Sequence, residues 1–495
     1  MLAPAVLVTL WFHASVFFLR WSDENVHLYV ARRVAEGAVL YRDIHSARPP
    51  LALAPLALGL WAGVPPLWVA RGSLVLVVLA TAAMLRWAGR RLFGPWQGVA
   101  AAALFLLAPE VYARSSWTGI HLVALGGLVC AVLAWRGRAL GAGLAGGLAL
   151  AAGQHAAVLV AGAALIVMLR RRAGLVRFVA GTTLGLIGPL GFAALFSGPG
   201  AVWEDLIGRH LYHLEAATSA AEGDLGFFLG SALLENLPWL ALAVASGLMP
   251  EPGDGAQDAR RARWVFAALA AAHLTTVTAM TGGLILYAFP AVPLVSLLAG
   301  DGLVRLVRWA RSGVAWPRRG LVVAAALTIA LAMSWHVARQ RYRERDHRVY
   351  SPFPYVRQVQ MSRLQRLTVT SRVAELVTPR LREGDTLSGY PTLASAVALE
   401  LNRRLAGELA DLAPRWMQLG LVSRESVIER IEADHVRVFV AQAGSLEANP
   451  TFKGYLARCY EPPQVIERTR GEGGGIPRVN VFVHVDGECG TPTRQ

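Results

Sequence analysis

Apolar residues occur in long runs over the first two thirds of the chain, and short polar stretches separate these runs. A helix that crosses a bilayer needs about 20 apolar residues, and shorter helices can cross within a bundle. On this basis the pattern predicts about eleven membrane-spanning helices. The predicted spans are 1–19, 66–89, 98–112, 120–135, 139–153, 156–170, 175–196, 231–249, 264–281, 284–304 and 320–338. The shorter run 51–62 predicts a re-entrant or juxtamembrane helix.

The pattern changes near residue 339, where charged residues and two prolines follow the last apolar run. The later pattern predicts helices over 371–382, 393–404 and 423–433 and strands over 385–389, 435–441 and 478–485. Alternating strands and helices are typical of a small three-layer α/β domain. The predicted fold is therefore mainly α: a polytopic helical membrane domain, 1–338, followed by an α/β domain, 339–495.

Residues 24–36 predict an amphipathic helix between the first apolar runs. Val26 and Val30 lie on its apolar side, and Gly37 ends it. We expect such a helix to lie flat in the membrane interface. A second pattern of this kind occurs within 201–230.

Arginines gather at alternate ends of the predicted spans, and the positive-inside rule places those ends in the cytoplasm. These arginines are Arg86, Arg90, Arg91, Arg136, Arg138, Arg170, Arg171, Arg172, Arg260, Arg261, Arg263, Arg318 and Arg319. The loops 20–50, 113–119 and 197–230 and the tail 339–495 then lie outside. The predicted location is the inner (plasma) membrane, with multiple spans and an extracytoplasmic α/β domain.

The loop 20–50 holds five arginines although it is predicted to lie outside. One interpretation is that they meet lipid phosphates there. The other is that Arg32 and Arg33 only cover the solvated face of a short helix.

Composition agrees with a membrane protein, because 55% of the 495 residues are hydrophobic. The formal net charge is +15, but the arginines form no basic helix or stripe, so no nucleic-acid partner is expected. Cys459 and Cys489 lie in the predicted α/β domain and can form a disulfide if that domain faces an oxidising compartment.

Two polar elements flank the predicted amphipathic helix: Asp23-Glu24 and Arg48-Pro49-Pro50. A charge held at a bilayer surface is a functional-site hypothesis by default. The arrangement resembles the first extracytoplasmic loop of the C-type-fold glycosyltransferases (GT-C), which include protein mannosyltransferases and lipid A aminoarabinose transferases. In that family an Asp-Glu pair opens a juxtamembrane helix, and a K/R/H-P-P element follows.

The resemblance implies that Asp23 is the general base that deprotonates the acceptor hydroxyl, with Glu24 supporting it or hydrogen-bonding the acceptor. Arg48 matches the residue that binds the donor phosphate, for which a guanidinium is suited, and His45 is a candidate assistant. Two structural alternatives stay open. The carboxylates can cap the helix and favour its dipole, and Arg48 can be a snorkelling interface residue.

Weaker family elements add further substrate-binding candidates. His155 lies in a turn, 153–156, where relatives often have a lysine, and Gly153 replaces that lysine here. Tyr287 matches a Y-x-x-P-x-x-P element, although Leu286 replaces the usual basic residue.

Arg114 lies in a stretch similar to the family's second outer loop. Gly119 stands where the family has Asp or Glu, and Glu110 is the only nearby carboxylate. A divalent cation prefers several oxygen ligands, so no metal site is predicted, and no cofactor is expected.

The sequence thus predicts a membrane glycosyltransferase. It would move a sugar from a polyprenyl-phosphate donor to an extracytoplasmic glycan, lipid or protein acceptor, among membrane lipids. The competing class is a transporter or flippase for a lipid-linked glycan, which would show broken midplane helices and buried charges inside its spans. The predicted spans are nearly free of charge, which favours transfer. Gly119 and Leu286 leave open an inactive member.

Overall fold

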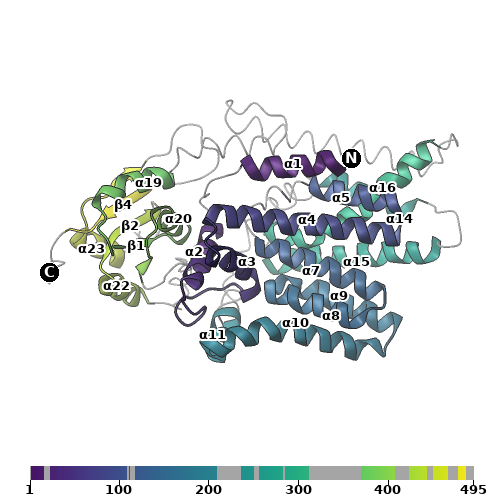
Figure 1. Ribbon diagram of the computed structural model, residues 1–495, viewed down its shortest axis with the longest axis horizontal. Coiled ribbons are helices and arrows are strands. Elements are labelled where there is room, and N and C mark those ends of the chain that lie inside the picture. The colour runs from purple at the N-terminus through teal and green to yellow at the C-terminus, as the bar shows by residue number, and fades with distance from the viewer. Residues whose placement is uncertain are drawn as a thin grey trace.

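The computed structural model describes residues 2–15, 23–108, 111, 118–208, 236–249, 256–281, 285–311, 369–406, 423–442, 450–466 and 478–485. The described chain forms two parts, a bundle of helices within 2–311 and a smaller α/β unit within 369–485 (Figure 1).

Long apolar runs form the helices of the bundle. They are α1 (Leu2–Ser15), α4 (Pro66–Leu92), α5 (Pro95–Leu106), α7 (Thr118–Trp135), α8 (Ala139–Ala152), α9 (Ala157–Arg170), α10 (Gly174–Ser197), α14 (Leu237–Leu248), α15 (Ala256–Thr281) and α16 (Val292–Arg311). Each predicted span on described residues overlaps one of these helices, and 320–338 lies outside the described residues. Among the described residues, 4 helices are long and apolar enough to cross a membrane: Pro66–Leu92, Thr118–Trp135, Gly174–Ser197 and Ala288–Arg311.

Small residues let helices α8 and α10 approach closely. A Cβ atom added at Gly143 would lie 1.9 Å from the Phe178 carbonyl oxygen, and one at Gly147 would lie 2.2 Å from that of Thr182. On α10, a Cβ at Gly181 would lie 2.3 Å from the Leu140 oxygen. Such contacts between small residues are typical of helices that pack within a membrane.

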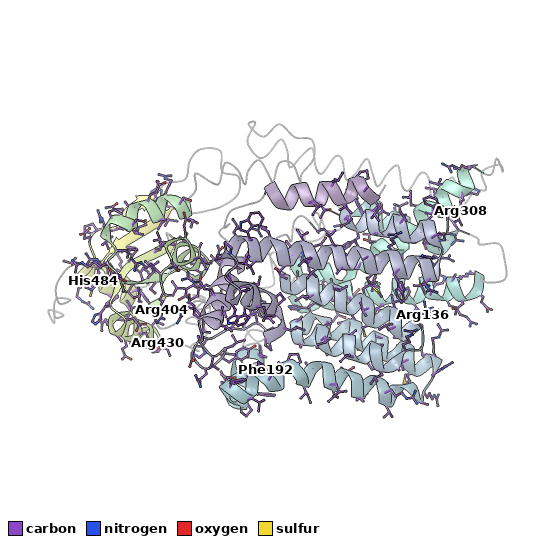
Figure 2. All side chains as sticks on the ribbon, viewed as in Figure 1. Arg136, Phe192, Arg308, Arg404, Arg430 and His484 are labelled. Carbon is purple, nitrogen blue, oxygen red and sulfur yellow. The ribbon has the colours of Figure 1, made fainter. Side chains whose placement is uncertain are left out.

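The outer face of α10 is strongly apolar. Leu184, Ile187, Phe192 and Leu195 are 65%, 58%, 67% and 82% exposed, and Figure 2 labels Phe192 near the α11 end of the helix. A continuous exposed apolar face of this kind is typical of a surface that contacts lipid.

The α/β unit is built around a 4-stranded sheet with the order β1-β2-β4-β3. The strands are β1 (Thr386–Gly389), β2 (Val436–Gln442), β3 (Gln464–Ile466) and β4 (Val479–Val483). Strands β1 and β2 are parallel, and the other neighbouring strands are antiparallel.

Helices cover both faces of this sheet. Helices α19 (Val369–Val377) and α20 (Pro391–Leu401) share one core with Val438 and Val440 of β2. Helices α22 (Arg424–Ala433) and α23 (Pro450–Cys459) share the other core with Phe439 and Ala441. Side chains alternate between the faces of a strand, so one strand serves both cores. The predicted helices and strands match this arrangement, whereas α23 and β3 were not predicted. The predicted boundary at 338/339 lies outside the described residues.

The predicted amphipathic helix is present as α2 (Asp23–Ala35), and Gly37 follows it with a φ of 103°, a value that favours glycine. The helix is buried from Glu24 to Ala31, so its polar side faces the protein, and its position in the membrane interface stays a prediction. It packs between α3 (Pro50–Trp61) on the bundle side and α20 of the α/β unit (Figure 1).

Polar residues of α2 bind the α/β unit instead of water. The Asn25 amide donates to the Thr392 carbonyl at 3.2 Å, and the Tyr29 hydroxyl accepts the Leu405 N–H at 2.6 Å. Arg33 is only 8% exposed and pairs with Glu36, so the interpretation of Arg33 as a solvated residue is wrong.

The cysteines differ in state. Cys130 is a buried free thiol of the bundle core, whereas Cys459 is buried in the α/β unit and is disulfide-bonded. Its predicted partner, Cys489, lies outside the described residues.

Candidate functional site

Charged side chains gather where the bundle meets the α/β unit. They come from α2, from the loop 36–49, from the start of α4 and from the segment 199–208, which consists of α11 (Pro199–Trp203) and the π-helix η2 (Glu204–Gly208). Long-range hydrogen bonds and ion pairs between these segments fix their mutual positions.

The first turn of α2 is tied to α4 by an ion pair. Both Glu24 oxygens accept from the Arg71 guanidinium, with Nη2 at 3.0 Å from Oε2 and Nη1 on Oε1. Glu24 is 5% and Arg71 3% exposed, so the pair is buried. Asp23 is the first residue of α2, where the helix dipole favours a carboxylate; its side chain lies outside the described part.

Arg48 contacts α2 through a histidine. Its Nε donates to Nε2 of His27 at 3.0 Å, and His27 is 6% exposed. Burial, followed by the neighbouring Arg48 charge, holds the pKa of His27 well below its usual range. The imidazole is therefore neutral at ordinary pH.

The backbone at Arg48 is also constrained. The Tyr41 hydroxyl donates to the Arg48 carbonyl at 2.7 Å, and Pro49 caps α3, which begins with Pro50. A proline restricts the residue before it to extended conformations, and proline is favoured at the first position of a helix. The Arg48-Pro49-Pro50 element thus ends the loop in a defined direction.

A buried carboxylate anchors the middle of the same loop. Asp205, which is 1% exposed, accepts the Ser46 N–H at 3.1 Å and lies 3.4 Å from Nδ1 of His45. His45 is thereby held against η2, on the same loop as Arg48.

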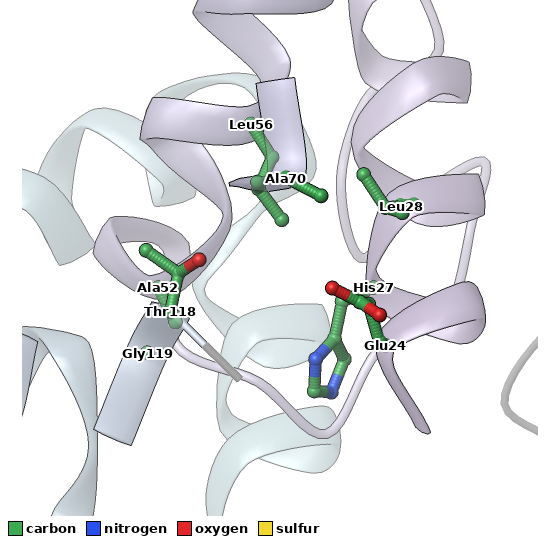
Figure 3. Close-up of a pocket in the computed structure, with 8 residues that line it drawn as sticks. All are labelled: Glu24, His27, Leu28, Ala52, Leu56, Ala70, Thr118 and Gly119. Carbon is green, nitrogen blue, oxygen red and sulfur yellow. The ribbon is translucent and has the colours of Figure 1, made fainter. Parts of the chain in front are cut away.

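A pocket lies beside α2 (Figure 3). Glu24 and His27 lie on one wall, and Thr118 and Gly119 at the start of α7 lie on the opposite wall. Apolar side chains of Leu28, Ala52, Leu56 and Ala70 complete the lining. The cavity volume open to the centre of a water-sized sphere is about 10 Å³, so the pocket has room for about one water molecule. Its lining combines a few convergent polar groups with apolar side chains, as ligand sites do.

The remaining candidates lie near this end of the bundle or outside the described residues. His155 is half-buried on η1 (Gln154–Ala156), which contacts η4 (Ile285–Ala291), the segment that holds Tyr287. His155 does not line the pocket, and the Tyr287 side chain lies outside the described part. Arg114 also lies outside it.

Gly119 lies in the pocket wall, so the position where the family has an acidic residue faces the site without a carboxylate. Within the described ranges, no group of three or more His, Cys, Asp or Glu side chains is placed to hold a metal ion.

Sequence reasoning missed Arg71, His27 and Asp205. Arg71 had a signal, because a lone arginine in an apolar run requires a buried partner. His27 also had one, since it follows Glu24 by three residues and so shares a helix face with it. Asp205 is 159 residues from Ser46, and no local pattern links the two.

Neither a protein-family model nor a curated protein sequence matches the chain. Solved structures do match. The crystal structure of ArnT from Cupriavidus metallidurans bound to undecaprenyl phosphate is 17% identical, with a TM-score of 0.64, over 99% of this chain and 98% of that chain. The apo state of the same protein gives 0.57 at 17% identity, over 98% and 97% of the two chains.

An oligosaccharyltransferase from Archaeoglobus fulgidus, in complex with Zn and sulfate, gives a TM-score of 0.50 at 12% identity. The match covers 94% of this chain and 72% of that chain. These likenesses show that the chain has the GT-C fold, and they confirm at the level of fold the resemblance carried by Asp23-Glu24 and Arg48-Pro49-Pro50.

Proposed function

We propose that the protein is a multi-pass membrane glycosyltransferase that moves a sugar from a polyprenyl-phosphate donor to a glycan, lipid or protein outside the cytoplasm. The proposal rests on the arrangement at the start of α2. There Arg48 donates a hydrogen bond to His27, and His27 lines a pocket together with Glu24. The fold is that of ArnT, whose structure holds undecaprenyl phosphate.

In the proposed reaction the acceptor hydroxyl oxygen attacks the anomeric carbon of the sugar. The bond from that carbon to the phosphate oxygen breaks, the hydroxyl proton passes to Asp23, and polyprenyl phosphate leaves. A carboxylate base opposite the leaving group fits transfer with inversion. Arg48 stabilises the negative charge that develops on the phosphate.

Glu24 has the supporting role in this scheme. Both of its oxygens are engaged by Arg71, so the carboxylate holds the first turn of α2 against α4. A fixed helix start sets the backbone position of Asp23, and positioning within a fraction of an ångström is worth a large part of enzymatic rate.

The position of the arginines supports the proposed orientation in the membrane. Arg136 and Arg308 lie at the end of the bundle away from the α/β unit (Figure 2). At that end Arg136 lies over Trp87 at 5.4 Å and Arg170 over Trp135 at 4.2 Å, as measured to the ring centroids. Arginine and tryptophan together are typical of a cytoplasmic membrane interface. The pocket and the α/β unit are then extracytoplasmic.

Single-cysteine labelling tests this orientation. A membrane-impermeant maleimide should label Arg42→Cys and Lys453→Cys in intact spheroplasts, and Arg171→Cys only after lysis. All three positions are exposed; Arg42 lies on the loop at the pocket, Lys453 in the α/β unit and Arg171 between α9 and α10. The native Cys130 is buried and Cys459 is disulfide-bonded, so these two give little background. Labelling of Arg171→Cys in intact spheroplasts would reverse the proposed topology.

The transporter alternative predicts buried charges within the bundle, and two predicted spans do hold one: Arg71 of α4, which pairs with Glu24, and Asp301 of α16. Asp301 Oδ2 accepts from Ser246 Oγ and from Arg263 Nε, each at 2.7 Å, and Arg305 lies beside it at 3.8 Å. These groups bind one another and tie α14, α15 and α16 together. A closed network of this kind is a structural contact, and it favours no transport path.

Mass spectrometry of envelope glycans and lipids tests the function in cells. Cells that hold the wild-type protein should contain a glycan, lipid or protein that carries one additional sugar, and this product should be absent without the protein and strongly reduced with Arg48→Ala. Identical product profiles, together with donor that accumulates on one side of the membrane, would favour the transporter.

A further inference from the structure

The contact between Arg48 and His27 has a fixed direction. Arginine has only donors, so Nε2 of His27 must present its lone pair to Arg48 Nε at 3.0 Å. The imidazole proton is then on Nδ1. His27 thus acts as a buried hydrogen-bond acceptor for a cation, a role that a protonated histidine cannot fill.

This contact restricts the arginine at its far end. A guanidinium is planar, so a bond that fixes Nε fixes the plane and the direction of both Nη groups. The near end is fixed as well, because Tyr41 holds the Arg48 carbonyl and Pro49 limits its backbone. A phosphate bound by two parallel N–H donors requires this kind of defined geometry.

We propose that His27 is a positioning residue for Arg48: as a neutral acceptor it holds the guanidinium in the orientation that meets the donor phosphate. The inference rests on the proposed function. It adds a residue whose proposed role is exerted through Arg48 and not on the reacting atoms.

The surroundings of His27 favour its neutral form. Arg48 lies beside it, and Glu24, one turn earlier on α2, is neutralised by Arg71 of α4. The pocket residues of α3, α4 and α7 bring no further charge. On the side of the α/β unit, Asn25 and Tyr29 bind backbone groups and Arg32 binds the Asn402 side chain.

Protonation of His27 would place two cations face to face and replace the accepting nitrogen by a donor. The pKa of His27 is lowered by burial and by Arg48, so this change occurs below the usual histidine range. Arg48 should therefore keep its orientation at neutral pH and lose it only in acid, well below the usual histidine pKa of about 6.5.

The test uses the Kd of the full-length, detergent-solubilised protein for undecaprenyl phosphate. We expect His27→Leu to raise the Kd roughly tenfold, since it removes a hydrogen bond to a charged group. His27→Gln keeps an acceptor oxygen near the Nε2 position, so its Kd should stay within about twofold of wild type.

A double variant separates positioning from a general structural effect. In the Arg48→Ala background His27→Leu should cause no further loss, because the two residues act as one unit. In a pH series from 7 downward, the Kd of the wild type should rise more than that of His27→Gln at the acid end, where the buried imidazole takes up a proton. The titration of the lipid phosphate affects both proteins alike, and only the wild type has the imidazole.

Each outcome has a distinct meaning. Wild-type affinity in His27→Leu, or an equal loss with and without Arg48, overturns the positioning role and leaves the proposed function standing. Absence of lipid binding by a folded wild-type protein overturns the proposed function itself, and the inference with it.

Discussion

Replacement of Asp23 by asparagine should leave the protein folded and able to bind the lipid donor, while turnover falls by about 10²–10⁴-fold, the usual worth of a positioned general base. The amide has the size of the carboxylate and can still accept a hydrogen bond from the first turn of α2, so a capping role survives the change. An amide cannot take the proton of the acceptor hydroxyl. Base catalysis is therefore the function that the substitution removes.

A matched control is available on the loop that carries Arg48. Asp43 is an exposed carboxylate that pairs with Arg42 and accepts the Val39 N–H. Asp43→Asn should keep wild-type turnover with a labelled polyprenyl-phosphate sugar. Wild-type turnover in well-folded Asp23→Asn would reduce the Asp-Glu pair to a helix cap.

Loss of either member of the Glu24–Arg71 pair should destabilise the protein by about 3–5 kcal/mol, because the remaining charge stays buried without its partner. The single substitutions that remove one partner are Glu24→Gln and Arg71→Met. The double variant Glu24→Leu/Arg71→Met should lie much closer to wild type, since no charge is then left in the interior.

Thermal unfolding in detergent measures this effect. The exposed pair Arg380–Glu461 of the α/β unit is the control, and Glu461→Gln should change stability by less than about 1 kcal/mol. Equal unfolding temperatures for Glu24→Gln, Arg71→Met and the wild type would show that the pair does not hold α2 on α4. The supporting role proposed for Glu24 would then be lost.

The helices of the bundle could be predicted because a bilayer span has one strong signature, a long apolar run. The elements of the α/β unit followed in the same way from alternating residues in β2 and β4. Strand β3 has only 3 residues, which is too short for a periodic pattern. Helix α23 contains Gly454, and glycine is a poor helix former that weakens a helical pattern.

The burial of α2 could not be predicted from its own residues. An amphipathic helix has the same pattern whether its polar side faces water or another part of the chain. Asn25 and Tyr29 bind backbone groups of residues 392 and 405, and this pairing is decided by the fold of the α/β unit. The helix that opens with Asp23 is thus held from both sides, which is favourable for a site that must not move.

Site residues that lie near one another in the sequence could be predicted, whereas contacts between distant segments could not. Glu24 and Arg48 belong to one loop and could be identified together. His45 was identified as well, but its partner Asp205 comes from η2 and could not be. The contact between Arg48 and His27 needed the three-dimensional path of the loop, although both residues lie in the same segment.

Transfer of label by the purified protein tests the proposed function most directly. The substrates are undecaprenyl-phosphate pentoses and hexoses that carry the label in the sugar, offered together with an extract of envelope glycans and lipids. The wild-type protein in vesicles should move label from one of these lipids to the extract and release undecaprenyl phosphate in equal amount, and Asp23→Asn should not. Label that crosses the vesicle membrane while still attached to its lipid, with no release of undecaprenyl phosphate, would contradict a transferase and identify a transporter.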